Sequence, residues 1–184
     1  MKNRALKTLY IYNGIFVFAA ALLGPLYAVY VGGIDRSVLA VSTSWSVFLL
    51  SIMVFTYAIS RFGDRVKEKK NLLMAAFLIR GGVWFAYIFV ASIPQLLILQ
   101  VISGLGEALG TPAFNAIFAE HLDKGKHIRE YGNWVIIAAG VMGVGTFIGG
   151  LVVTYLGFPY LFSAMSGLAI LSFFGVLRQP RHLL

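Results

Sequence analysis

Residues 103–114 read SGLGEALGTPAF, and they place a carboxylate, Glu107, in the middle of an apolar segment. From Pro94 to Ala119 the chain has no other acidic or basic residue. A charged side chain inside a bilayer is costly, so it normally faces the interior of a helix bundle or a water-filled cavity. If this segment crosses a membrane, Glu107 therefore predicts a protein-lined or water-filled site at that depth.

Composition supports a membrane location for the whole chain. Of the 184 residues, 59% are hydrophobic and 12% are charged. A soluble domain of this length could not bury so many apolar side chains. A helix needs about 20 apolar residues to cross the hydrocarbon core. Six segments are long enough, and they run continuously rather than alternating, so the sequence predicts an all-α integral membrane protein and not a β-barrel. The expected spans are 9–31, 38–60, 71–91, 94–119, 132–154 and 157–177, a single bundle over 1–184.

The basic residues are unevenly distributed among the connections between these spans. Of the fifteen Lys and Arg, thirteen lie at the N-terminus, at the C-terminus and in the loops 61–70 and 120–131. The other connections hold Arg36 alone, and Arg80 falls inside the third span. This positive-inside bias predicts a multi-pass protein of the plasma (inner) membrane with both termini and both basic loops in the cytoplasm. The net charge of +8 thus reflects topology, and we expect a lipid bilayer and no nucleic acid as partner.

The residues that usually signal metal or redox chemistry are scarce. There is no cysteine, and the three histidines have no zinc-ligand spacing. No nucleophile–base arrangement or metalloprotease motif occurs either. We therefore expect no metal site, no cofactor and no enzymatic activity.

A short pattern occurs twice, three spans apart. ALLGPLY (21–27) and ALGTPAF (108–114) both read Ala-Leu-x-x-Pro-x-aromatic. Equivalent segments that cross the membrane in opposite directions are typical of an inverted repeat of three plus three helices, here about 9–91 and 94–177. Proline bends a helix, so two bent helices at matching positions suit the walls of a cavity.

The fourth span has one polar face. On a helical wheel five of its polar side chains fall within an arc of about 120°, namely Gln100, Ser103, Glu107, Thr111 and Asn115. Two interpretations of the carboxylate remain open. Glu107 forms a structural ion pair with Arg80, or it lines a cavity and takes part in proton or cation traffic. Asn13 and Tyr27 project from similar faces of the first span, so the predicted substrate or ion pathway comprises Glu107, Arg80, Gln100, Ser103, Thr111, Asn115, Asn13 and Tyr27.

Four segments carry a resemblance to a known family. The loop SRFGDRVKEKK (60–70) is similar to the signature loop of the major facilitator superfamily, Gly-x-x-x-Asp-Arg-x-Gly-Arg-Arg. GTFIGG (145–150) resembles the family's Gly-Pro-x-x-Gly-Gly, with Thr146 in place of Pro. QVISGLGEALGTP (100–112) resembles the family's fourth span, with Gln100 where members often carry Arg, and the ending 155–174 is similar to the sixth span.

The resemblance implies roles for particular residues. Asp64, Arg65 and Lys69 match the family's cytoplasmic gating loop. The glycine-rich motif implies close helix packing by Gly145, Thr146, Gly149 and Gly150. The missing Pro weakens an assignment as a drug–proton antiporter. The missing Arg puts in doubt proton coupling by that position, for which Glu107 and Arg80 are the available substitutes.

The family has twelve spans in two halves, and this sequence resembles the N-terminal half. We therefore expect a half-size transporter of a small solute that works by alternating access together with a second six-helix half, most simply a second copy in a parallel homodimer. The alternatives are a membrane structural or regulatory subunit without transport activity, and an N-terminal fragment of a twelve-span transporter.

Overall fold

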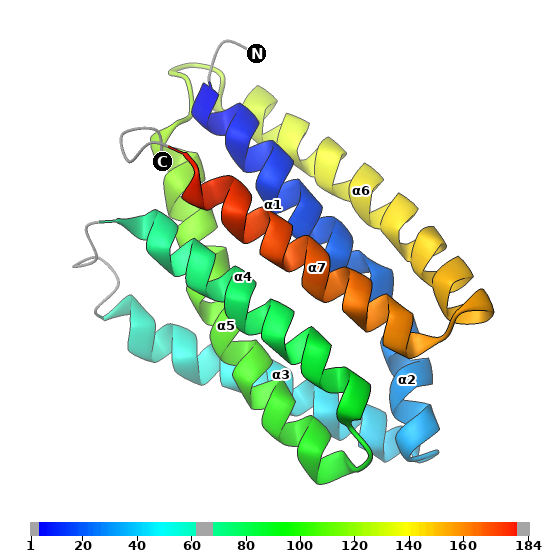
Figure 1. The fold of residues 1–184 in the computed structure, drawn as a ribbon. Coiled ribbons are helices and arrows are strands. Elements are labelled where there is room, and N and C mark those ends of the chain that lie inside the picture. Colours follow the sequence, from blue (N-terminus) through cyan, green and yellow to red (C-terminus); the bar gives the residue numbers. More distant parts are fainter. Residues whose placement is uncertain (1–3, 62–67, 180–184) are drawn as a thin grey trace.

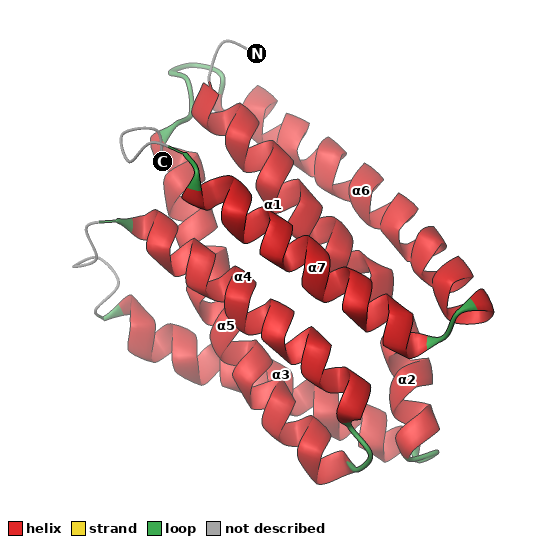
Figure 2. Cartoon of the chain, viewed as in Figure 1, coloured by secondary structure: helices red, strands yellow, loops and turns green. Residues whose placement is uncertain are grey.

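The computed structural model describes residues 4–61 and 68–179, and all regular structure in these ranges is helical (Figures 1 and 2). Six helices are long and apolar enough to cross a bilayer, so the prediction of a six-span, all-α membrane protein is confirmed. The elements are α1 (Arg4–Leu23), α2 (Leu26–Ile34), α3 (Val38–Ser60), α4 (Lys69–Ala86), the 3-10 turn η2 (Tyr87–Phe89), α5 (Ile93–Glu120), α6 (His127–Tyr155) and α7 (Phe158–Leu177).

The helices pack in an order that has the symmetry of an inverted repeat. The most extensive contacts link neighbours in the series α3, α5, α4, α7, α1, α6. Exchanging each helix of the first half with its counterpart in the second (α1 with α5, α3 with α6, α4 with α7) gives the same series in reverse. The bundle is therefore the 3+3 arrangement expected from the sequence. The start of α1 and the end of α7 lie at one end of it, which we call the terminal end (Figure 1).

Burial separates two outer helices from the rest. In α3 and α6 only 11% of the span is buried, whereas at least 44% is buried in each of the other spans. Two apolar clusters fill the interior. Tyr30, Trp84 and Leu161 belong to the one away from the termini, and Leu9, Phe77 and Phe118 to the one near the terminal end.

The first span is broken rather than bent, which corrects the expectation drawn from its proline. Pro25 has no N–H to donate to Ala21 O, so the helical ladder stops and the chain turns at Gly24, whose φ is +21°. The freed carbonyl of Ala21 accepts a hydrogen bond from Thr146 Oγ1 of α6 at 3.3 Å. Pro112 instead lies inside the continuous helix α5, so the two prolines of the repeat have different effects.

The loop limits also differ from those expected. α6 begins at His127, inside the segment 120–131 that was expected to be a loop, and α4 begins at Lys69, inside 61–70. An apolar pattern does not detect a polar first turn. In α6 that turn carries Glu130, whose negative charge suits a helix N-terminus and whose Oε2 accepts a hydrogen bond from Asp123 N at 2.8 Å.

Candidate solute pathway

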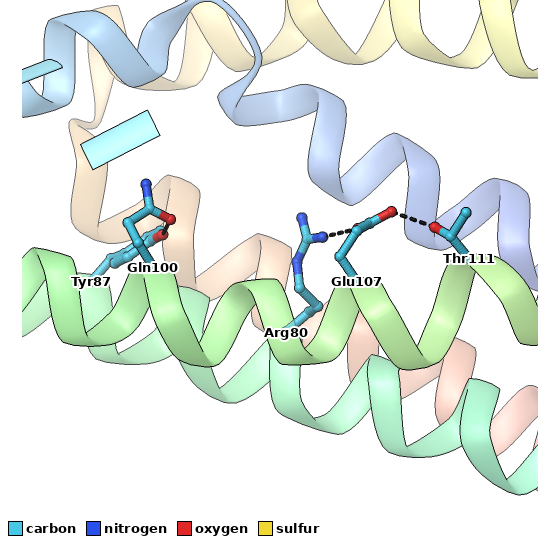
Figure 3. A network of polar contacts seen from close by, with 5 residues as sticks. All are labelled: Arg80, Tyr87, Gln100, Glu107 and Thr111. Carbon is cyan, nitrogen blue, oxygen red and sulfur yellow. Dashed lines mark hydrogen bonds and ion pairs between the residues drawn. The ribbon is translucent and has the colours of Figure 1, made fainter. Parts of the chain in front are cut away.

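The charged centre of the bundle is an ion pair between adjacent helices. Arg80 on α4 and Glu107 on α5 are joined through Arg80 Nη1 and Glu107 Oε2. Thr111 Oγ1, one turn further along α5, donates a hydrogen bond to the other carboxylate oxygen (Figure 3). The Arg80 side chain is 12% exposed and that of Glu107 is 32% exposed. The structure thus brings together the two intramembrane charges, with the carboxylate the more accessible of them.

Aromatic rings surround the guanidinium. Arg80 Cζ lies 5.2 Å from the ring centroid of Trp84 and 5.8 Å from those of Phe16 and Phe48. The negative faces of aromatic rings attract a cation, most strongly where water is excluded. Arg80 therefore has three attractive neighbours in addition to Glu107, while its Nε is buried without a hydrogen-bond partner.

Glycine on α5 makes room for this arginine. A Cβ at Gly106 would lie 2.9 Å from Arg80 Cγ, and one at Gly110 would lie 2.7 Å from Ala76 Cβ. Contacts this short force a neighbour to move, so side chains at these positions would push α5 away from α4. Gly106 and Gly110, four residues apart on α5, thus permit the close approach of α4.

A second polar group lies further from the terminal end. Tyr87 donates a hydrogen bond to Gln100 Oε1 at 3.1 Å, as Figure 3 shows. Gln100 Nε2 in turn donates to the hydroxyl of Tyr27, and Tyr27 donates to Ser44 Oγ at 2.8 Å. All four side chains are buried, and they come from α2, α3, η2 and α5. The chain of hydrogen bonds satisfies these polar groups and connects the two halves of the repeat.

Two cavities adjoin the ion pair. The first, about 360 Å³, is lined by α1, α4, α5 and α6, and its polar lining includes Asn13, Thr111 and Thr146. The second, about 320 Å³, is lined by α1, α2, α3, α4, η2 and α5, and its lining includes Gln100 and Ser103. Arg80 and Glu107 line both.

Along α4 and α5 the two cavities extend in opposite directions from the pair. α5 runs toward the terminal end; the first cavity includes Thr111, which follows Glu107, whereas the second includes Gln100, which precedes it. On α1 the first cavity also reaches Gly24 and Pro25, at the end of that helix away from the termini. The ion pair borders two spaces of small-molecule size.

The predicted pathway residues separate into groups. Asn13 and Thr111 line the first cavity, while Tyr27, Gln100 and Ser103 line the second. Asn115 is exposed and lines neither cavity, although it continues the polar face of α5 by one more turn.

Of the three residues assigned to the family's gating loop, Lys69 is the one that the structure describes. Asp64 and Arg65 lie outside the described residues. Lys69 forms an ion pair with Glu120, which ties the start of α4 to the end of α5 at the terminal end.

Two glycines of the glycine-rich motif of α6, Gly145 and Gly149, pack closely against α1. A Cβ at Gly149 would lie 1.9 Å from Leu22 O, and one at Gly145 would lie 3.1 Å from Phe18 O. Thr146 lies between them in the sequence and lines the first cavity. Its hydroxyl donates the hydrogen bond to the freed Ala21 carbonyl. Gly150 points away, since nothing lies within 4 Å of its added Cβ.

Several lining residues had no place in the sequence-based pathway. Trp45 and Phe48 come from α3, and Met142 from α6; Ser44 of α3 lines neither cavity but accepts a hydrogen bond from Tyr27. Ser44 is one of several serines and threonines in α3, so the sequence gives no signal that singles it out. The aromatic residues give no such signal either, because rings are common throughout membrane helices.

Fold and site together define a multi-pass integral membrane protein built as an inverted repeat, with a polar pathway between its helices. The family model described as Major Facilitator Superfamily matches residues 9–183, and the chain belongs to this family of transporters. The chain is also similar to a protein of Bacillus subtilis (strain 168) described as "Uncharacterized MFS-type transporter YitZ". The two are 26% identical over 156 residues, which cover 84% of this chain and 94% of that relative.

Proposed function

We propose that this protein transports a small solute across the membrane by alternating access, with the Arg80–Glu107 pair as the barrier between the two cavities. One observation carries the proposal: the pair lines both cavities, and along α4 and α5 these extend from it in opposite directions. A transporter must separate two such spaces and connect each in turn to its own side.

The pair is suited to opening and closing. When it separates, Arg80 keeps its three ring contacts and Glu107 keeps the hydroxyl of Thr111. Neither charge is then left without a partner, which lowers the cost of the open state relative to an isolated buried pair. Gly24 lines both cavities beside the break between α1 and α2, where the backbone lacks one helical hydrogen bond and bends more readily.

Proton coupling through Glu107 is part of the proposal. A protonated Glu107 has no net charge and attracts Arg80 less, so proton uptake favours separation of the pair. In proteoliposomes, Glu107→Gln is expected to remove the dependence of solute flux on a pH gradient. A flux that keeps its full response to the gradient in this variant argues against coupling at Glu107.

The proposed working unit is a parallel homodimer in the plasma (inner) membrane with both termini cytoplasmic. The similarity to YitZ covers nearly all of that protein, which supports a transporter made from chains of this length. The poorly buried helices α3 and α6 flank the cavities and offer apolar surface for a second copy. In this dimer the loop residues Asp64, Arg65 and Lys69 contribute to a cytoplasmic latch, as in the family.

Cysteine accessibility tests the barrier directly, because the chain has no cysteine of its own. Asn13→Cys reports on the first cavity and Trp45→Cys on the second. With a charged, membrane-impermeant thiol reagent on oriented vesicles, each is expected to react from one side only, and the two from opposite sides. Adding Glu107→Gln is expected to make each reactive from both sides.

A matched control is Ala169→Cys, since Ala169 is fully buried and lines neither cavity; it should stay unreactive from both sides. Reaction of Asn13→Cys and Trp45→Cys from the same side contradicts the barrier.

A further inference from the structure

The two cavities present a solute with a single pair of charges. Among the described residues that line them, Arg80 and Glu107 are the charged ones. The charge that a solute must carry therefore depends on which member of the pair it can reach and replace.

Accessibility favours the carboxylate. The side chain of Glu107 is 32% exposed and that of Arg80 is 12% exposed. Rings on α1, α3 and α4 cover the guanidinium at 5.2–5.8 Å. A solute cation can thus approach Glu107 along the cavity, whereas an anion would first have to displace aromatic side chains from Arg80.

The wall of the second cavity favours the same charge. Tyr27, Trp45, Phe48, Trp84 and Tyr87 all line it. The rings of Tyr27 and Trp45 have centroids 5.4 Å apart, and those of Trp45 and Phe48 are 5.2 Å apart, so these three form a continuous surface. Ring faces attract organic cations and repel anions.

Cation binding at Glu107 exchanges one partner of the carboxylate for another. An ammonium group bound to Glu107 takes the place of the Arg80 guanidinium, and Arg80 remains on its three rings. The site then holds two cations and one carboxylate, so its net charge rises by one, and the ring contacts of the two cations must offset that cost.

We propose that the second cavity binds small organic monocations, with the cationic group at Glu107 and the apolar part against Trp45 and Tyr27. This inference rests on the proposed transport function, because it names the class of solute for the same pathway. A volume of about 320 Å³ suits an aryl- or alkylammonium compound.

The test is a binding measurement by tryptophan fluorescence in nanodiscs of zwitterionic lipid. Two of the three tryptophans, Trp45 and Trp84, line the second cavity, and the third, Trp134, packs against Tyr10 and Phe114. The probes are phenyltrimethylammonium, its neutral isostere tert-butylbenzene, and benzenesulfonate as an anion of similar size. The cation is expected to bind the wild-type chain at least about tenfold more tightly than the anion, with the neutral compound between them.

Variants assign the effect to one carboxylate. Glu107→Gln is expected to weaken binding of phenyltrimethylammonium at least about tenfold and to strengthen binding of benzenesulfonate, because Arg80 is then the uncompensated charge. Glu120→Gln is the matched control. Glu120 is likewise a glutamate of α5 in an ion pair with a basic residue of α4, but it lines neither cavity. It should leave both affinities unchanged.

Equal or tighter binding of the anion to the wild-type chain overturns the inference, and this comparison needs no variant to fold. Unchanged affinity for the cation in a folded Glu107→Gln chain overturns it as well. Binding of the cation without flux contradicts the transport function and leaves the binding site intact. Flux of an anion contradicts the cation site and leaves the transport function standing.

Discussion

At the scale of single residues, the stability of the site depends on two charged side chains that are largely removed from water. Arg80 and Glu107 partly neutralise each other, and rings and Thr111 provide the remaining contacts. Removing one partner of a buried pair strands the other, whereas replacing both with apolar residues can be neutral or stabilising. This asymmetry separates a structural role of the pair from a functional one.

Arg80→Ala is expected to destabilise the protein, because Glu107 then retains only Thr111. The loss in soluble proteins is about 3–5 kcal/mol, and we expect the lower end because Glu107 is partly exposed. The double variant Arg80→Leu with Glu107→Leu should recover most of the loss and still abolish function. Thermal unfolding in mild detergent, followed by tryptophan fluorescence, measures both.

Lys69→Ala is the control for this series, since it breaks the other ion pair between α4 and α5 at an exposed position. A change within about 1 kcal/mol is expected there. If Arg80→Ala unfolds at the wild-type temperature, the pair does not hold these helices together.

Sequence could predict the pair but not its surroundings. Charges are so rare in the spans that depth alone matches Arg80 with Glu107. Trp84, Phe16 and Phe48 meet around the guanidinium only because three helices converge there, and nothing local in the sequence encodes that convergence. Ser44 and Tyr27 are likewise partners only after α2 and α3 have packed.

At the scale of the helices, span centres were predictable and span ends were not. Hydropathy locates the apolar middle of α6, but its first turn is polar and begins at His127. The two prolines show the same limit. Each was expected to bend its helix, yet Pro25 follows Gly24 and ends α1, while Pro112 is accommodated inside α5.

The approach of α6 to α1 depends on one glycine. A Cβ at Gly149 would sit 1.9 Å from Leu22 O, a backbone atom that cannot rotate away. Gly149→Ala is therefore expected to separate the helices at a cost of about 1–3 kcal/mol or more. The drop in melting temperature in detergent measures it.

The neighbouring Gly150→Ala provides the matched control, because its added Cβ meets nothing within 4 Å. Alanine in a helix interior gains about 0.5–1 kcal/mol over glycine, so this variant should melt at or above the wild-type temperature. Equal effects of the two substitutions would show that helix propensity, and not the contact with α1, determines the result.

At the scale of the whole molecule, the distribution of basic residues predicts the orientation. Asp35 and Lys126 are both exposed, at opposite ends of the bundle. Asp35→Cys is expected to react with an impermeant maleimide from outside the cell, and Lys126→Cys only after the membrane is opened. Reaction of both in intact cells would refute the assigned topology.

Two copies of the bundle can meet through the face that carries the cavities. That face is flanked by α3 on one edge and α6 on the other. A two-fold axis along the membrane normal in front of it sets α3 of one copy against α6 of the next and encloses Glu107 from both copies. In the proposed dimer a second copy covers this face, so that the partly exposed carboxylate of Glu107 is not turned toward lipid, where a charge is costly.

Disulfide formation between co-expressed single-cysteine chains tests this arrangement. Leu49 on α3 and Val144 on α6 are exposed and lie near the middle of their spans. Chains with Leu49→Cys and chains with Val144→Cys are expected to crosslink to each other in native membranes. Leu171 on α7 is equally exposed and lines neither cavity, so Leu171→Cys should not crosslink with Leu49→Cys.

Crosslinking only to a different membrane protein would favour a separate second half, and a monomer that still moves solute would refute the dimer. If the Leu49–Val144 crosslink forms and also stops flux, the interface and the solute pathway are the same face of the bundle.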